Sequence, residues 1–232
     1  MTMENTLNEE LIQAIESRHS VRHYTDRPID STVVAQLNGV IDQCNREGNL
    51  RIQLVLEDSH TFGSFMVHYG AFSGVRNYFA IVGKGEKLSE RAGYYGERLV
   101  LEAQRLGLNT CWVALTYSKK RCRDRVNFGL GERLVCVIAL GYGVTQGHGH
   151  KVKTFEQVTR CQSDVPQWFR NGVQAALLAP TAVGQQQFRF HLLDNNRVRA
   201  VAKIGFYTHI DLGIVKLHFE LGAGVHNFTW AE

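Results

Sequence analysis

Hydrophobic and polar positions in the first part of the chain follow helical spacing and strand spacing in turn. Residues 7 to 17 predict a helix, and a second helix begins at Asp30 or Ser31 and carries an apolar stripe. Residues 50 to 57 alternate between apolar and polar side chains, which is typical of a strand with one buried face. The next predicted elements are a strand over 78–82 and a long helix over 86–106 that stops at Gly107.

Two short apolar runs in the middle of the chain, residues 110–115 and 134–140, predict strands that are buried on both faces. A basic helix over 118–127 separates them, and we expect helices to cover the sheet on both sides. The last predicted elements are a helix that begins at Pro166, a strand over 188–193 and a helix over 206–221. This mixture indicates an α+β fold, with a mixed α/β sheet covered by helices.

Composition limits the class of protein. The chain has 232 residues, of which 44% are hydrophobic, so one large domain or two small ones would bury a substantial core. The formal net charge is +4, and Lys and Arg are scattered apart from a cluster between Lys119 and Arg125. Nucleic acid is therefore not favoured as a partner.

Cysteine usage and the absence of long apolar runs indicate the compartment. Five cysteines form no C-x-x-C pair, and an odd number cannot all be paired within one chain. The acidic beginning of the chain has no apolar signal core, and no stretch reaches about 18 uninterrupted apolar residues. We expect a reduced, cytoplasmic protein without a membrane anchor. Structural zinc is not expected either, since the ten His and five Cys do not cluster at ligand spacings apart from His148 and His150 in a Gly-rich loop.

The chain contains a weak internal repeat. Asn38-Gly39-Val40 precedes a strand in the same way as Asn171-Gly172-Val173, and Gly93-Tyr94-Tyr95 opens a helix in the same way as Gly205-Phe206-Tyr207. The common order suggests a duplicated unit, so that one chain imitates a two-fold dimer. Chance similarity between aromatic-rich helices that follow strands is the alternative.

The segment Ser17 to Tyr24 has the pattern of an anion site. Its sequence is S-R-H-S-V-R-H-Y, with Arg18, Ser20 and Arg22 at every second position. In an extended backbone these three side chains point to one side. Two guanidinium groups and a hydroxyl match the oxygens of a phosphate, although the same spacing also occurs on solvated surfaces.

Several segments together resemble the nitroreductase family of FMN-dependent oxidoreductases, in particular its single-chain branch known as putative TM nitroreductases. They are the R-H-S-V-R-H-Y segment, the helix G-Y-Y-G-E-R-L-V-L-E-A-Q-R-L-G-L with N-T-C-W-V after it, I-A-L-G-Y-G, and A-P-T-A-V-G-Q-Q-Q-F-R-F. The resemblance implies a nitroreductase-like fold. It also implies bound FMN, with reduced nicotinamide, NAD(P)H, as electron donor.

The resemblance assigns a phosphate site to the first half of the chain. In the family the R-x-S-x-R segment binds the FMN phosphate and ribityl chain, which implies Arg18, Ser20 and Arg22, with His19 inside the motif but pointing the other way. A basic pair after the G-Y strand end implies Lys151 and Lys153, which equally fit a solvated loop. These cations would balance a phosphomonoester of nearly two negative charges.

The resemblance also assigns residues near the flavin ring. The family's loop after the long helix offers backbone N–H groups near N5, which here implies Trp112, Val113, Ala114 and Leu115. Leu115 departs from the expected glycine, and this leaves the backbone contact in doubt because glycine permits closer approach. Cys111 is expected to be a packed core thiol, since no basic residue is near it in sequence.

The last implied segment is the A-P-T loop, which resembles the family's A-P-S-x-x-N-Q-Q loop. In ordinary dimeric members that loop reaches across from the partner subunit to the flavin, and here it implies Ala179, Pro180, Thr181, Ala182 and Gln185. Gly184, Gln187 and Phe188 replace the common Asn, Pro and Trp, so fewer polar contacts to the ring are expected. Because the phosphate motif occurs only in residues 1–160 and the A-P-T loop only in 161–232, we expect two nitroreductase-like halves that share one FMN.

The expected activity is transfer of hydride from NAD(P)H through FMN to a quinone, a nitroaromatic or a similar small acceptor. The chemistry belongs to the flavin, so no catalytic side chain is expected, and Tyr69, Phe72, Trp112 and Phe188 are candidates to wall the acceptor side. The alternatives are a flavin-binding or storage protein without turnover, and a reductive dehalogenase-like or flavin-modifying member of the superfamily. Either way we expect a monomer with an internal pseudo-two-fold, and neither a nucleic-acid partner nor a membrane.

Overall fold

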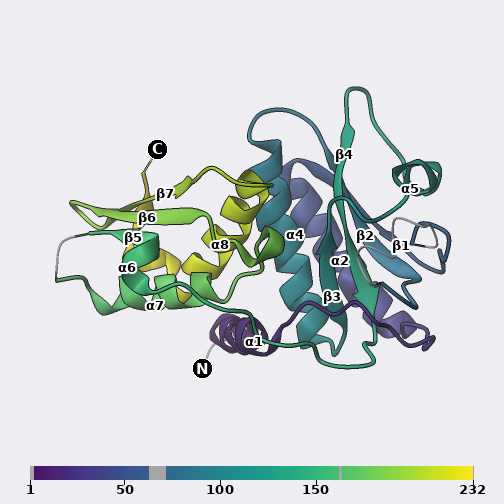
Figure 1. Ribbon diagram of the computed structural model, residues 1–232, viewed down its shortest axis with the longest axis horizontal. Coiled ribbons are helices and arrows are strands. Elements are labelled where there is room, and N and C mark those ends of the chain that lie inside the picture. The colour runs from purple at the N-terminus through teal and green to yellow at the C-terminus, as the bar shows by residue number, and fades with distance from the viewer. Residues whose placement is uncertain (1–2, 63–71, 162–163, 232) are drawn as a thin grey trace. The chain divides into compact units, whose positions relative to one another are not determined.

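The computed structural model describes residues 3–62, 72–161 and 164–231 (Figure 1). The chain divides into two compact units, one of Arg18–His148 and the other of Met1–Ser17 with Gly149–Glu232. Each unit has its own four-stranded sheet. No helix in the described part of the chain is long and apolar enough to cross a membrane.

The unit Arg18–His148 is built on an antiparallel sheet in the order β1-β2-β4-β3. Its elements are α2 (Ser31–Gly48), β1 (Leu50–Val55), β2 (Asn77–Gly83), α4 (Leu88–Arg105), β3 (Asn109–Val113), α5 (Lys119–Arg125) and β4 (Arg133–Gly141). The sequence predicted each of them, most from the pattern of apolar positions and α5 as a basic segment between two apolar runs. The α+β fold class is likewise confirmed.

Both faces of this sheet are buried. Helices α2 and α4 pack on one face, where Phe79 and Ile81 of β2 are fully covered. Tyr78, Ala80 and Val82 point to the opposite face and join a second apolar cluster, which includes Tyr24 and Cys122 of α5. Burial on both sides explains why β2 and most of β4 read as uninterrupted apolar runs.

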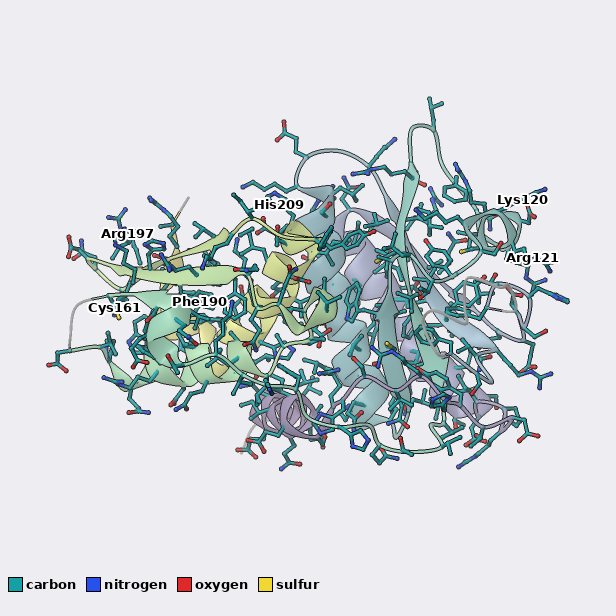
Figure 2. The ribbon with its side chains drawn as sticks, in the orientation of Figure 1. Lys120, Arg121, Cys161, Phe190, Arg197 and His209 are labelled. Carbon is teal, nitrogen blue, oxygen red and sulfur yellow. The ribbon has the colours of Figure 1, made fainter. Side chains whose placement is uncertain are left out.

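The second unit has a mixed sheet in the order β5-β6-β7-β8, with parallel outer pairs and an antiparallel β6-β7 hairpin. Helices α7 and α8 pack closely together, and Phe169, Phe190 and Phe219 form an aromatic core with Trp230 (Figure 2). Its elements are α1 (Met3–Ser17), α6 (Phe155–Val158), β5 (Thr159–Arg160), α7 (Gln167–Leu177), the 3-10 turn η1 (Ala182–Gly184), β6 (Phe188–Leu193), β7 (Arg197–Ala202), α8 (Thr208–Ala223), the 3-10 turn η2 (Val225–Asn227) and β8 (Thr229–Trp230).

The outer face of this second sheet is cationic. Register places His191 of β6 between Arg199 of β7 and Arg160 of β5, and both arginines are exposed. Burial lowers the pKa of His191, and the charges of Arg160, Arg189 and Arg199 lower it further. The first sheet is thus buried on both faces, as expected, whereas the second sheet has one exposed, cationic face.

The two units share the order helix, strand, antiparallel strand, helix, namely α2-β1-β2-α4 and α7-β6-β7-α8. Both second helices also follow a residue in the left-handed region, Lys87 at φ 49° and Tyr207 at φ 55°. This common order supports the predicted duplication, which stays a prediction, as does its division at residue 160.

The short sequence matches on which the repeat was predicted do not occupy equivalent positions in the two units. Gly93-Tyr94-Tyr95 lies inside α4 rather than at its start, whereas Gly205 precedes α8. Gly39 is exposed, whereas Gly172 is buried so close to Phe219 that a Cβ would lie 2.8 Å from its ring. The two units therefore resemble each other in the order of their elements, and the matched triplets do not align equivalent residues.

Candidate functional site

The segment after α1 is extended and lies along the edge strand β3. Ser20 forms a parallel bridge with Thr110, and the Val21 N–H donates to the Thr110 carbonyl oxygen at 3.0 Å. Further along, the Thr25 N–H donates to the Tyr142 carbonyl oxygen at 2.8 Å. The extended conformation predicted for the R-x-S-x-R motif is confirmed, and these bonds fix the positions of its side chains.

Arg18, Ser20 and Arg22 all influence the thiol of Cys111. Burial raises the pKa of Cys111, which is 4% exposed, while Arg22, a hydrogen bond from Ser20 and Arg18 lower it. The core position predicted for Cys111 is confirmed. Its basic neighbours come from a segment distant in sequence, which the sequence analysis missed.

Arg18 also approaches a buried carboxylate on α4. Its Nε lies 3.8 Å from Oε1 of Glu97, and the two side chains are 3% and 0% exposed. Burial lowers the pKa of Arg18, and the Glu97 carboxylate opposes this change. Glu97 was not among the predicted site residues, although its spacing from Gly93 and Val100 places it on the buried face of α4.

Trp112 points from β3 onto α4 and donates its Nε1–H to Oε2 of Glu97 at 2.8 Å. A Cβ on Gly96 would lie 2.5 Å from the indole, so glycine is needed where the ring crosses the helix. Val113 is buried, Ala114 is half-buried and Leu115 is 60% exposed. The accessible part of the predicted ring-binding loop is thus its carboxyl end, at Ala114 and Leu115.

Of the two predicted phosphate-binding lysines, Lys151 is exposed and Lys153 anchors a loop. The Lys153 ammonium donates to the carbonyl oxygens of Gln185 and Gln186 at 2.9 Å each, and burial and Lys203 lower its pKa. The Lys153 N–H donates to Oε1 of Gln186 at 2.7 Å. Lys153 therefore supports the A-P-T loop, and its role toward a phosphate stays a prediction.

The A-P-T loop between α7 and β6 is held in an unusual backbone conformation. Ala179 is buried, Pro180, Thr181 and Ala182 are half-buried, and the Gln186 N–H donates to Oγ1 of Thr181 at 3.1 Å. Positive φ angles occur at Val183 (49°), Gly184 (66°) and Gln186 (47°). Glycine tolerates such an angle without cost, which accounts physically for Gly184.

Asp211 in the first turn of α8 accepts two donors from this loop. The Ala182 N–H lies 3.0 and 3.2 Å from its two oxygens, and Nε2 of Gln185 lies 2.9 Å from Oδ2. Burial raises the pKa of Asp211 to about 6, although both of these hydrogen bonds lower it. The Gln185 amide, predicted to contact the cofactor, is thus engaged by Asp211 and by the backbone of Phe206.

Comparison with known proteins supplies the family. The sequence model of the family described as Putative TM nitroreductase matches residues 10–223. The chain belongs to this family. No curated protein matches the sequence. Membership in this family supports a flavin-dependent oxidoreductase in general terms.

Solved structures show the nitroreductase fold. A protein named as a putative nitroreductase from Thermotoga maritima MSB8 superposes with a TM-score of 0.65 at 20% identity, covering 94% of this chain and 86% of that one. A putative nitroreductase in complex with FMN from Desulfovibrio desulfuricans has a TM-score of 0.51 at 16% identity, with 67% and 96% covered. A nitroreductase family protein from Streptococcus pneumoniae TIGR4 has a TM-score of 0.51 at 13% identity, with 63% and 97% covered.

The residues of the R-x-S-x-R segment fit the phosphate of the family's flavin. Nε of Arg18 is buried and has no hydrogen-bond partner within the described part of the chain. Arg22 is exposed and Ser20 half-buried beside it. A buried guanidinium donor without an acceptor, next to an accessible cation and a hydroxyl, is a donor set suited to phosphate oxygens.

The aromatic residues predicted for the acceptor side have different surroundings within their own units. Phe188 is 1% exposed in the core of its unit, and Trp112 packs on α4. Phe72 lines a cavity of about 350 Å³ with Tyr24, Phe62 and Arg76. Tyr69 lies outside the described residues. Phe188 is thus a core residue, and no pattern in the sequence distinguishes it from an active-site aromatic.

Proposed function

We propose that this protein binds one FMN and transfers hydride from NAD(P)H, through the flavin, to an electron-poor acceptor such as a quinone or a nitroaromatic. The observation that carries the proposal is the convergence of Arg18, Ser20 and Arg22 at the edge of β3. Family membership supports it, because the range that matches the family, residues 10–223, includes this segment.

Each segment has a separate task in this proposal. Arg22 and Ser20 bind the phosphate, and Arg18, already balanced by Glu97, contributes its buried Nε–H. His19 lies in the same segment, and Lys151 and Lys153 supply further positive charge. The backbone of Trp112, Val113, Ala114 and Leu115 and the loop residues Ala179, Pro180, Thr181, Ala182 and Gln185 bind the ring. Bound FMN itself supplies the chemistry of accepting and donating hydride.

A second candidate function is flavin binding or storage without turnover. Two observations favour it: Leu115 stands where a glycine is expected, and the Gln185 amide is already engaged by Asp211. Both reduce the number of protein donors that reach a flavin ring. A reductive dehalogenase-like or flavin-modifying reaction would use the same cofactor with another acceptor.

The experiment begins with the visible absorption spectrum of the freshly purified protein and mass identification of the released chromophore. We expect FMN, and then steady oxidation of NADH or NADPH when a quinone or a nitroaromatic is added. Bound FMN that neither nicotinamide reduces would favour the storage function. A colourless protein that does not bind added FMN would contradict both.

The proposal includes assembly as a monomer in the cytoplasm. If both halves of one chain supply the flavin ligands, one polypeptide suffices, whereas ordinary relatives require two. Light scattering of the holoprotein should give the mass of one chain, 26.2 kDa. A dimer that dissociates only with loss of FMN would contradict the single-chain site.

A further inference from the structure

Asp211 binds the loop of residues 179–186, and the proposed function assigns this carboxylate no role. The carboxylate is 3% exposed and accepts from the Ala182 backbone and the Gln185 side chain. No charged side chain contributes to its pKa shift, which burial dominates. His209, its nearest titratable neighbour along α8, is exposed (Figure 2). A buried carboxylate without a cation is costly, which requires an explanation.

The other unit has a counterpart at the same position of its repeat. Asp211 is the fourth residue of α8, and Arg91 is the fourth residue of α4. Arg91 donates to the carbonyl oxygens of Gly48 and Asn49, at 2.6 and 3.0 Å, where α2 turns into β1. In both repeats, therefore, this position fixes the connection from the first helix to the first strand.

A second link in each repeat reaches the segment before the second helix. Arg91 also donates to the carbonyl oxygens of Lys84 and Glu86. In the second unit Gln185 has this task, because its amide donates to Phe206 O and accepts the Phe206 N–H. A Cβ on Gly205 would lie 2.5 Å from Oε1 of Gln185, so the close approach requires glycine there.

The two connections differ in length and in the groups that they present. A single residue, Asn49, separates α2 from β1, and there carbonyl oxygens face Arg91. Residues 178–187 separate α7 from β6, and there the Ala182 N–H faces Asp211. A carboxylate, which only accepts, is the side chain that holds such donors. Positive φ angles at Val183 and Gln186 show that the loop adopts a conformation that needs outside support.

We propose that Asp211 is a positioning residue, which fixes the loop of residues 179–186 in the conformation that the FMN site requires, with Gln185 as the intermediate link. This inference rests on the proposed function, in which that loop contacts the flavin ring. Asp211 itself does not touch the cofactor. Its negative charge is retained in a buried place because neutral side chains would hold the Ala182 N–H and the Gln185 amide less firmly.

The test compares Asp211→Asn and Gln185→Ala with Arg91→Lys as the matched control at the equivalent position. Asparagine keeps the shape of Asp211 but presents an amide donor to the loop. We expect the Kd for FMN to rise about tenfold in Asp211→Asn and about threefold in Gln185→Ala, on the scale of a charged and a neutral hydrogen bond. Arg91→Lys should bind FMN within about twofold of the parent protein. The absorption and fluorescence of bound FMN should change in Asp211→Asn and Gln185→Ala but not in Arg91→Lys.

A second measurement separates this inference from the proposed function. Amide hydrogen exchange of residues 179–186 without FMN should be faster in Asp211→Asn and unchanged in Arg91→Lys. Unchanged FMN affinity and spectrum in Asp211→Asn would overturn the inference, and so would equal weakening in Arg91→Lys. If the parent protein binds no FMN while exchange still depends on Asp211, the proposed function fails and the structural hold on the loop is established.

Discussion

The fourth residue of α4 and the fourth residue of α8 perform the same task with opposite charge. Arg91 binds carbonyl oxygens at a one-residue turn, and Asp211 binds N–H donors of a longer loop. Both side chains fix the connection before the first strand of their repeat. The two units thus carry a polar anchor at the same position of a helix, and the backbone groups that each anchor meets match the sign of its charge.

The buried carboxylates of the two units differ in a related way. Glu97 of α4 faces Arg18 and accepts from the indole of Trp112. Asp211 of α8 is held by hydrogen bonds from a backbone N–H and a side-chain amide. A charged partner offsets burial more fully than neutral dipoles do. Removal of Arg18 beside Glu97 and protonation of Asp211 should therefore affect stability in different ways.

The largest expected effect concerns the cation beside Glu97. Arg18→Ala leaves the fully buried Glu97 carboxylate without its positive neighbour, and the free energy of unfolding should fall by about 3–5 kcal/mol. Urea denaturation of the apo-protein at neutral pH measures it. Arg22→Ala, which removes an exposed cation of the same segment, should change the stability by less than about 0.5 kcal/mol. Equal losses in the two variants would show that burial does not distinguish these arginines.

The next effect is a pH dependence that Asp211 imposes on stability. The folded pKa of Asp211 is raised from 3.8 to about 6, so the folded state binds the proton more tightly than the unfolded state. The contribution of Asp211 to stability should therefore fall as pH rises from below 4 through 6, by about 3 kcal/mol in total, and stay constant above that range. Denaturation of the parent protein and Asp211→Asn across this range measures the difference between them. A difference that does not vary with pH would contradict the raised pKa.

Sequence alone predicted most elements of both units, because their burial follows simple periodicities. The strand over 188–193 and the helix beginning after Pro166 have the predicted bounds or nearly so. Strand β7 was missed, since its sequence R-V-R-A-V-A alternates arginine with small apolar residues and carries little hydrophobic signal. The short β5 and β8 depend on pairing with neighbours that are distant in sequence.

The part of the candidate site that lies in one short segment could be predicted from the sequence. The parts that depend on contacts between distant segments could not. The spacing of Arg18, Ser20 and Arg22 was enough to place them in one short segment, and all three influence the same thiol, that of Cys111. Asp211 gave no such signal, because its donors come from a loop between α7 and β6. The same reason applies to Arg18, whose partner Glu97 becomes a neighbour only when α4 packs on the sheet.

Arg22 provides the binding counterpart to the stability effect of Arg18. Because Arg22 is exposed and converges with Ser20 on the same place, Arg22→Ala should weaken FMN binding by about 1.5–3 kcal/mol. Titration of the apo-variant with FMN measures it, and the spectrum of the bound flavin should not change. Arg98→Ala, which removes a cation bound to Glu47, is the control and should bind FMN normally. Unchanged affinity in Arg22→Ala would remove this residue from the site.

The smallest expected effect contrasts arginines on the two sheets. Arg199 lies opposite His191 with Arg160 on the other side, so Arg199→Gln removes repulsion and should stabilise the protein by about 0.2–1 kcal/mol at low salt. Arg51 of β1 instead donates to Glu132 at 2.7 Å, and Arg51→Gln should destabilise the protein slightly. Both differences should shrink in about 1 M salt, where the screening length is about 3 Å. Thermal unfolding at two salt concentrations measures them, and an NMR titration should show the His191 pKa rising in Arg199→Gln. A loss of stability in Arg199→Gln that salt abolishes would mean that Arg199 has an acidic partner, contrary to the cationic character of this face.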